Sequence, residues 1–198
     1  TDNPALFGGG YGQNTVITGN ATVNIIPNEQ NINIYGSGYG GSSLGKMNSN
    51  VTVNIKDIPA GQGNATDGDT TRTLSITGYI FAGGKGNTST AATIAGDATI
   101  NVDGSNLPDC SVFGGNDING TTSGNIIVNV GRTYESKLYA AYGGGNQANI
   151  TTSTPNVKVY LLTYSNVTNA FNGGRAADLR SSGNSDTSRA IYLQGGHA

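Results

Sequence analysis

The chain has 198 residues, of which 11% are charged, and its formal net charge is −2. Because the ten Lys and Arg residues are scattered along the chain, they do not form the clustered basic surface typical of nucleic-acid-binding proteins. The single cysteine, Cys110, excludes an intrachain disulfide, and no stretch approaches the ~18 apolar residues of a membrane-spanning helix.

Two short motifs alternate along the chain. The first is an apolar and then an aromatic residue leading into a glycine-rich corner, with the aromatic residues Phe7, Tyr35, Phe81, Phe113, Tyr139 and Phe171. The second is a strand of the type Thr-Val-Asn-Ile, at residues 22–25, 52–55, 99–102, 127–130, 158–161 and 190–193. A weaker third strand is expected at 15–18, 92–95 and 149–151. Short strands and glycine turns repeated at this spacing are typical of a solenoid.

The predicted fold class is therefore all-β: a single-stranded, right-handed parallel β-helix of about six turns. The right-handed coil is expected because crossovers between parallel strands have that hand. We expect one domain over residues 1–198, as a segment of a longer protein, because both ends fall within the repeat. Residues 56–73 lengthen one repeat and are expected to leave the rod as an inserted loop.

Stacked turns place equivalent residues of the second motif above one another. Period two directs one column inward, consisting of Val23, Val53, Ile100, Val128, Val159 and Ile191. A second inward column consists of Ile25, Ile55, Val102, Val130, Leu161 and Leu193. The outward positions between them predict an asparagine ladder of Asn24, Asn54, Asn101 and Asn129, continued by Tyr160 and Tyr192.

The glycine corners and the aromatic residues before them are interpreted structurally. Sharp corners favour glycine because it adopts positive φ at little cost. Strict alternation would turn the aromatic column outward, where it could bind a sugar or a partner. Four of its six members are phenylalanine, which favours the alternative that the rings are buried at the corners.

Few residues have the pattern of a chemical site. Asp67 and Asp69, near Asn64, are candidate calcium ligands, and Asp117 is a weaker one. Neither site has a complete calcium-binding loop, so no cofactor is predicted apart from this calcium candidate. No column of stacked carboxylates is found, and His197 is the single histidine, so we do not expect an enzyme. The candidate ligand or partner face comprises Asn24, Asn54, Asn101, Asn129, Tyr160 and Tyr192.

The pattern of aromatic-Gly-Gly, a variable corner, Gly-Asn/Asp-x-Thr-Val-Asn-Ile and Ile-Tyr/Phe-Gly resembles the repeats of large bacterial cell-surface β-helix proteins. These include adhesins and autotransporter-like passenger domains. The resemblance covers nearly the whole chain and implies an exported, extracellular protein at the cell surface. Its implied role is a non-enzymatic stalk or adhesive rod that binds a protein or glycan. Open solenoid ends also predict end-to-end self-association.

Two alternatives remain open. One is the shaft of a phage tail fibre or tailspike, which is also built from parallel β structure but is usually trimeric. The other is an ice- or carbohydrate-binding face that uses a threonine column, Thr22, Thr52 and Thr99, beside the asparagine ladder. Ile127 and Lys158 interrupt this column, which argues against an ordered ice-binding plane.

Overall fold

The computed structural model describes residues 5–27, 31–57, 73–150, 156–176 and 189–195. Their strands form three parallel sheets, here named A, B and C. Sheet A contains β1 (Ala5–Phe7), β4 (Ile32–Tyr39), β7 (Leu74–Phe81), β10 (Asn106–Phe113), β13 (Ser136–Tyr142) and β15 (Ser165–Phe171). Sheet B contains β2 (Val16–Ile17), β5 (Lys46–Met47), β8 (Ala92–Ile94) and β11 (Gly120–Thr122). Sheet C contains β3 (Ala21–Ile25), β6 (Val51–Lys56), β9 (Ala98–Asp103), β12 (Ile126–Val130), β14 (Val157–Leu161) and β16 (Arg189–Leu193).

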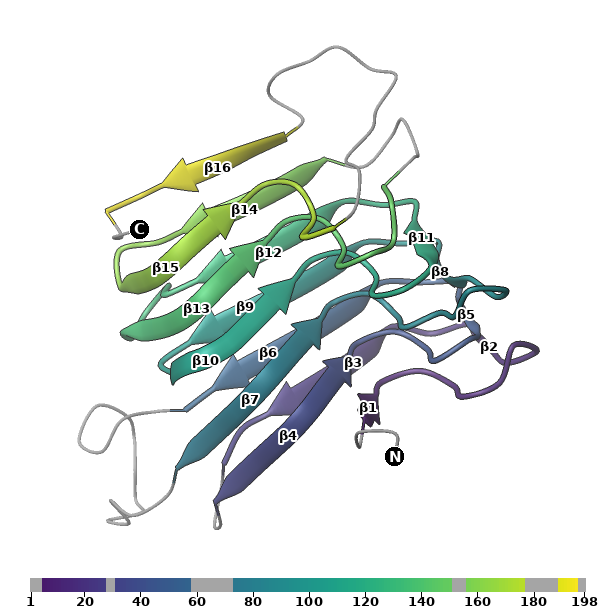
Figure 1. The fold of residues 1–198 in the computed structure, drawn as a ribbon, viewed down its shortest axis with the longest axis horizontal. Helices are drawn as coiled ribbons and strands as arrows, with labels where there is room; N and C mark the ends of the chain where they lie inside the picture. Colours follow the sequence, from purple (N-terminus) through teal and green to yellow (C-terminus); the bar gives the residue numbers. More distant parts are fainter. Residues whose placement is uncertain (1–4, 28–30, 58–72, 151–155, 177–188, 196–198) are drawn as a thin grey trace.

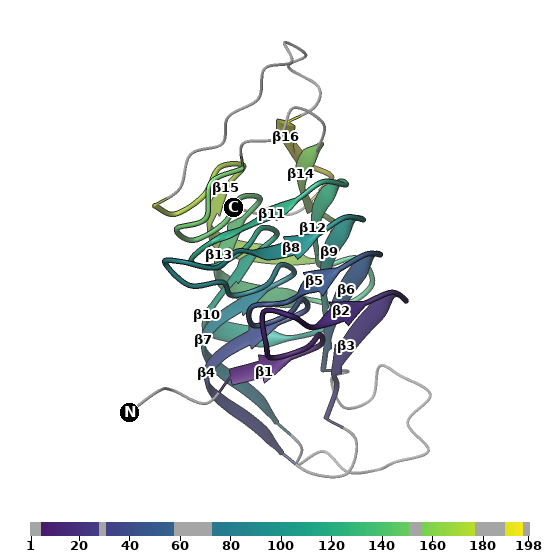
Figure 2. The ribbon, with the colours of Figure 1, turned by 90° about the vertical axis from the view of Figure 1, so that its right-hand side faces the viewer.

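Through β12 the chain visits the three sheets in turn, and from β13 on the described strands alternate between sheets A and C. Each strand pairs with its equivalent in the next turn (Figure 1). About five turns stack in this way. Within each sheet the strands stack in chain order along the axis (Figure 2), and the buried apolar residues of the main core come from all three sheets. The predicted all-β parallel solenoid is confirmed, while the right-handed coil stays a prediction. The third strand is also confirmed at β2 and β8, and it recurs at β5 and β11, where the sequence pattern did not predict it.

Both predicted apolar columns of sheet C are confirmed by the strand register. Val53, Ile100 and Val128 lie in line on successive strands and are buried. The second column behaves in the same way at Ile55 and Val102. Toward the last strand burial is lost, because β16 has a neighbour on one side among the described strands.

Besides the predicted asparagine ladder of sheet C, a second row of hydrogen-bonded Asn and Asp side chains lies at the corner before sheet C. The side-chain oxygen of Asn20 accepts a hydrogen bond from the backbone N–H of Asn50 in the next turn, at 3.2 Å. The side-chain oxygen of Asn50 accepts a hydrogen bond from the Asp97 N–H at 2.9 Å. A carboxylate oxygen of Asp97 accepts one from the Asn125 N–H at 2.6 Å. This capping of the following turn explains why Asn or Asp recurs two residues before the Thr-Val-Asn-Ile strand.

The glycine corners between sheets A and B correct one expectation. The stacked corner glycines, such as Gly83 and Gly115, do not have positive φ, whereas Gly86, later in the connection between β7 and β8, does. The corner glycines are required instead by close contact between stacked backbones: a Cβ on Gly83 would lie 2.5 Å from the Gly115 oxygen. The Gly83 N–H also donates to that oxygen at 3.2 Å, so glycine lets successive corners hydrogen-bond directly.

The aromatic column differs from the predicted one at two positions. Its members in register are Phe7, Tyr39, Phe81, Phe113, Tyr142 and Phe171. Each ring stacks on the next, with centroids 4.5 to 5.1 Å apart. Tyr35 and Tyr139, which the sequence reading placed in this column, are 67% and 52% exposed on the outer face of sheet A. That assignment was wrong because the register follows the stacked glycine corners, and Tyr39 and Tyr142 directly precede these.

The middle of the aromatic column is buried. Phe81 and Phe113 have no exposed surface, and the Tyr79 ring packs edge-on against both. Arg175 lies over the Tyr79 ring, with its guanidinium carbon 5.5 Å from the ring centroid. The rings form a cluster separate from the main core, so the column is a second, aromatic core at the corner.

Candidate functional site

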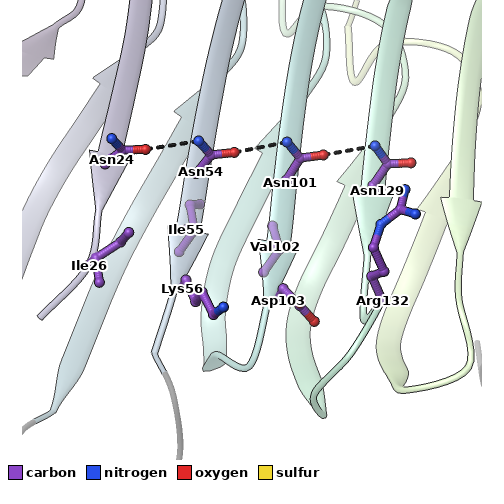
Figure 3. A pocket seen from close by; sticks show the side chains of 10 residues that line it. All are labelled: Asn24, Ile26, Asn54, Ile55, Lys56, Asn101, Val102, Asp103, Asn129 and Arg132. Carbon is purple, nitrogen blue, oxygen red and sulfur yellow. Dashed lines mark hydrogen bonds between the residues drawn. The ribbon is translucent and has the colours of Figure 1, made fainter. Parts of the chain in front are cut away.

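The asparagine ladder on the outer face of sheet C is confirmed. The side-chain nitrogen of Asn54 donates to the side-chain oxygen of Asn24 at 2.8 Å, and Asn101 and Asn129 repeat the bond at 2.9 and 2.8 Å (Figure 3). An amide has two N–H donors and an oxygen with two lone pairs. The ladder uses one donor and one lone pair of Asn54 and Asn101, so each amide keeps one of each for a ligand.

The ladder forms one side of a groove of about 460 Å³ on this face. The opposite side is a second row, formed by Ile26, Lys56 and Asp103, each two residues after a ladder asparagine, and by Arg132, three residues after Asn129 (Figure 3). Between the rows, Ile55 and Val102 point inward, and their backbone forms the floor. The groove therefore crosses the strands and runs along the solenoid axis.

The corner after sheet C positions the charged members of this second row, Lys56, Asp103 and Arg132, which are called the charged row below. One carboxylate oxygen of Asp103 accepts hydrogen bonds from the backbone N–H groups of Thr133 and Tyr134, at 2.8 and 2.9 Å. These bonds fix the corner that carries Arg132. The Lys56 ammonium lies 5.4 Å from the centroid of the Tyr134 ring, a cation–π distance. Neither Lys56 nor Arg132 forms an ion pair with a carboxylate in the described part of the chain.

The sequence reading missed this charged row, although part of it was detectable. Lys56 and Asp103 follow ladder asparagines by two residues, so period two places them on the same outward face. Arg132 was not detectable in this way. It follows Gly131, whose φ of 70° ends the alternation and redirects the chain.

Tyr160 and Tyr192 continue the ladder as predicted. The register aligns them with Asn129, and their rings stack with centroids 4.8 Å apart and planes 15° apart. The Lys158 ammonium lies 5.7 Å from the Tyr192 ring centroid. Because the two rings stack on one another, the faces that they turn toward each other are not open to a ligand.

The threonine column of the ice-binding alternative is in register on the same face, from Thr22 to Thr52 and Thr99. Ile127 then replaces threonine on β12, as the sequence indicated. The regular threonine array thus spans three strands.

The candidate calcium residues have different outcomes. Asp67 and Asp69 lie outside the described residues, as does most of the inserted loop at 56–73. Asp117 is buried, and its two carboxylate oxygens accept hydrogen bonds from the Tyr39 hydroxyl at 2.7 Å and the Asn146 side-chain nitrogen at 2.9 Å. Asp117 therefore links the aromatic column to the corners. Within the described ranges, no three His, Cys, Asp or Glu side chains gather as a metal site.

Comparisons with known proteins found no significant match to a family model, a curated protein or a solved structure. In the described part of the chain, no helix is long and apolar enough to cross a membrane.

Proposed function

We propose that this chain is a non-enzymatic rod of an exported bacterial surface protein, and that the outer face of sheet C binds ligands. The observation that carries the proposal is the continuous stacking of turns along one axis. Backbone hydrogen bonds, the asparagine ladder and the aromatic column all run in that direction. A pull along the axis loads all of these rows together, which suits a stalk that bears force.

The groove of sheet C supports the ligand-binding part of the proposal. Its polar lining is mostly amides, which bind by hydrogen bonds but neither release nor take up protons near neutral pH. Binding without turnover fits such a surface. A protein loop or a glycan would both find donors and acceptors at a fixed spacing.

The test is adhesion by a displayed rod. The chain is fused to a surface anchor in a non-adherent bacterium, and adhesion to glycan-coated and cell-coated surfaces is counted under flow. We expect adhesion, its loss when the groove is blocked by the bulky neutral side chains of Asn54→Trp with Asn101→Trp, and its retention in Tyr139→Ala on sheet A. Both variants must first show wild-type β-sheet circular dichroism. Equal adhesion of the blocked and wild-type rods, or no adhesion to any surface, would contradict the proposal.

A further inference from the structure

We propose that the groove of sheet C takes a linear acidic polysaccharide, which lies along the solenoid axis with its acidic groups at Lys56 and Arg132. This inference rests on the proposed ligand-binding face and names its ligand class. It follows from the direction of the groove, the spacing of its polar groups and the positive charge of the two side chains that form no ion pair with a described carboxylate.

The direction of the groove favours a polymer. Its lining comes from β3, β6, β9 and β12 and from the corner after β12, so it continues over four turns (Figure 3). Each turn adds about 4.8 Å along the axis. This repeat is close to the length of one sugar residue in an extended chain, so successive sugars meet successive amides.

The chemistry of the ladder favours sugar hydroxyls. Asn54 and Asn101 each retain one N–H and one oxygen lone pair, and a hydroxyl group both donates and accepts. Single-stranded nucleic acid needs aromatic faces on which bases stack. The Tyr134 ring beside the groove lies against the Lys56 ammonium, and Tyr160 and Tyr192, which continue the ladder, stack on each other. An extended peptide binds a sheet at its edge strand, and this groove lies on the face.

The charges favour an acidic chain. Lys56 and Arg132 belong to turns two apart, which is about 10 Å along the axis. That separation equals about two sugars, so the groove suits a polymer with an acidic group on every second residue. Asp103 lies between the two cations, in register with Lys56, so two positive charges and one negative charge leave the row a net charge of +1. One carboxylate oxygen of Asp103 accepts the Thr133 and Tyr134 N–H groups at the corner, and neither cation forms an ion pair with a described carboxylate.

The test compares two acidic polysaccharides, each with a neutral counterpart of the same backbone, and a single-stranded nucleic acid. The whole chain is immobilised, and binding of hyaluronate, its methyl ester, dextran sulfate, dextran and poly(dT) is measured by biolayer interferometry. Hyaluronate carries a carboxylate on alternate residues, and dextran sulfate shows whether sulfate is taken instead. We expect at least one acidic polysaccharide to bind about tenfold more tightly than its neutral partner, and binding to weaken as salt screens the charges.

A matched pair of variants locates the site. Lys56→Gln with Arg132→Gln should lower affinity for the acidic polysaccharide about tenfold, whereas Lys85→Gln with Lys137→Gln, which removes the same charge elsewhere, should leave it within about twofold. Equal losses in both variants would show non-specific attraction and overturn the proposal. So would poly(dT) binding that is as tight and as sensitive to the groove variant, or no binding of any acidic polysaccharide. If a neutral glycan or a protein binds the groove instead, the adhesive rod stands and the ligand class is wrong.

Discussion

Ile100 shows how strongly one residue depends on the stacking of turns. It is fully buried between Val53 and Val128, and polar neighbours are absent from its column. Ile100→Asp buries an unpaired carboxylate, so we expect it to destabilise the chain by at least about 4 kcal/mol. Thermal unfolding followed by circular dichroism measures this. Thr99→Asp, on the outward side of the same strand, is the control and should cost less than about 1 kcal/mol. A folded, soluble Ile100→Asp variant with a wild-type melting temperature would refute the register.

The corner glycines allow a test of backbone contact. A Cβ at Gly83 would lie 2.5 Å from the Gly115 oxygen, whereas a Cβ at Gly173 meets no atom of the described residues within 4 Å. We expect Gly83→Ala to lower the free energy of unfolding by about 2 kcal/mol, because the neighbouring backbone cannot move without breaking its own ladder. Gly173→Ala should be neutral or slightly stabilising. Urea unfolding compares the two, and equal effects would mean that contact does not explain the corner glycines.

The buried thiol of Cys110 makes the free energy of unfolding decrease at alkaline pH. Burial raises the pKa of its thiol from an ordinary 9.0 to about 12. Because the folded pKa lies above the unfolded one, the stabilisation is complete below pH 9 and is lost as pH rises toward 12. From pH 8 to pH 10 we expect the free energy of unfolding to fall by about 1.4 kcal/mol more in the wild type than in Cys110→Ala. Parallel urea titrations at the two pH values would detect this, and identical slopes would contradict it.

At the scale of elements, the Tyr39–Asp117 bond ties sheet A to a distant corner. The bond joins residues 78 apart in sequence and is buried. Burial, and then the hydrogen bond to Asp117, raises the pKa of Tyr39 well above its ordinary value, so the hydroxyl stays a donor at physiological pH.

Removing the Tyr39 hydroxyl tests how much its hydrogen bond to Asp117 contributes to stability. Tyr39→Phe keeps the ring stack but leaves a buried carboxylate oxygen without its donor, and we expect a loss of about 2 kcal/mol in stability. Tyr142→Phe, in the same column, is the control: its hydroxyl makes no hydrogen bond to a described residue, so the loss should be below about 0.5 kcal/mol. Calorimetric melting of both variants separates the two cases. A similar change in both would assign the effect to the column rather than to the bond.

At the scale of the whole molecule, the outermost described strand is an open edge. Leu193 is 64% and Ile191 is 37% exposed on β16, and at the opposite end Leu6, Val16 and Ile26 are exposed. Unpaired strand edges with apolar side chains promote pairing with another chain.

We therefore expect this chain to self-associate end to end as its concentration rises, which multi-angle light scattering would measure. Ile191→Lys with Leu193→Lys should shift association to at least about tenfold higher concentration. Tyr35→Lys with Tyr139→Lys adds the same charge to the face of sheet A and should not. A monomer at all concentrations, or equal shifts in both variants, would contradict the expectation.

Sequence periodicity predicted the sheet C side of the molecule well. Inward valine and isoleucine columns and the outward asparagine ladder recur at the same positions of strands that pair without a register shift, so alternation alone assigns each side chain to a face. The solenoid class follows from the same repetition. Lys56 and Asp103 could have been added by extending that alternation two residues.

Only the tertiary structure determined which aromatic residues of sheet A lie in register and stack. Corner lengths vary there, so the distance in sequence from one aromatic residue to the next does not define the register. The sequence pattern predicts Tyr35 and Tyr139 in the aromatic column, whereas the strand register places Tyr39 and Tyr142 there. The same applies to the Asp117–Tyr39 bond and to Arg132 in the groove. Each depends on contacts between different turns or on a backbone bend at glycine, whereas the sequence pattern determines which face of a strand a residue occupies.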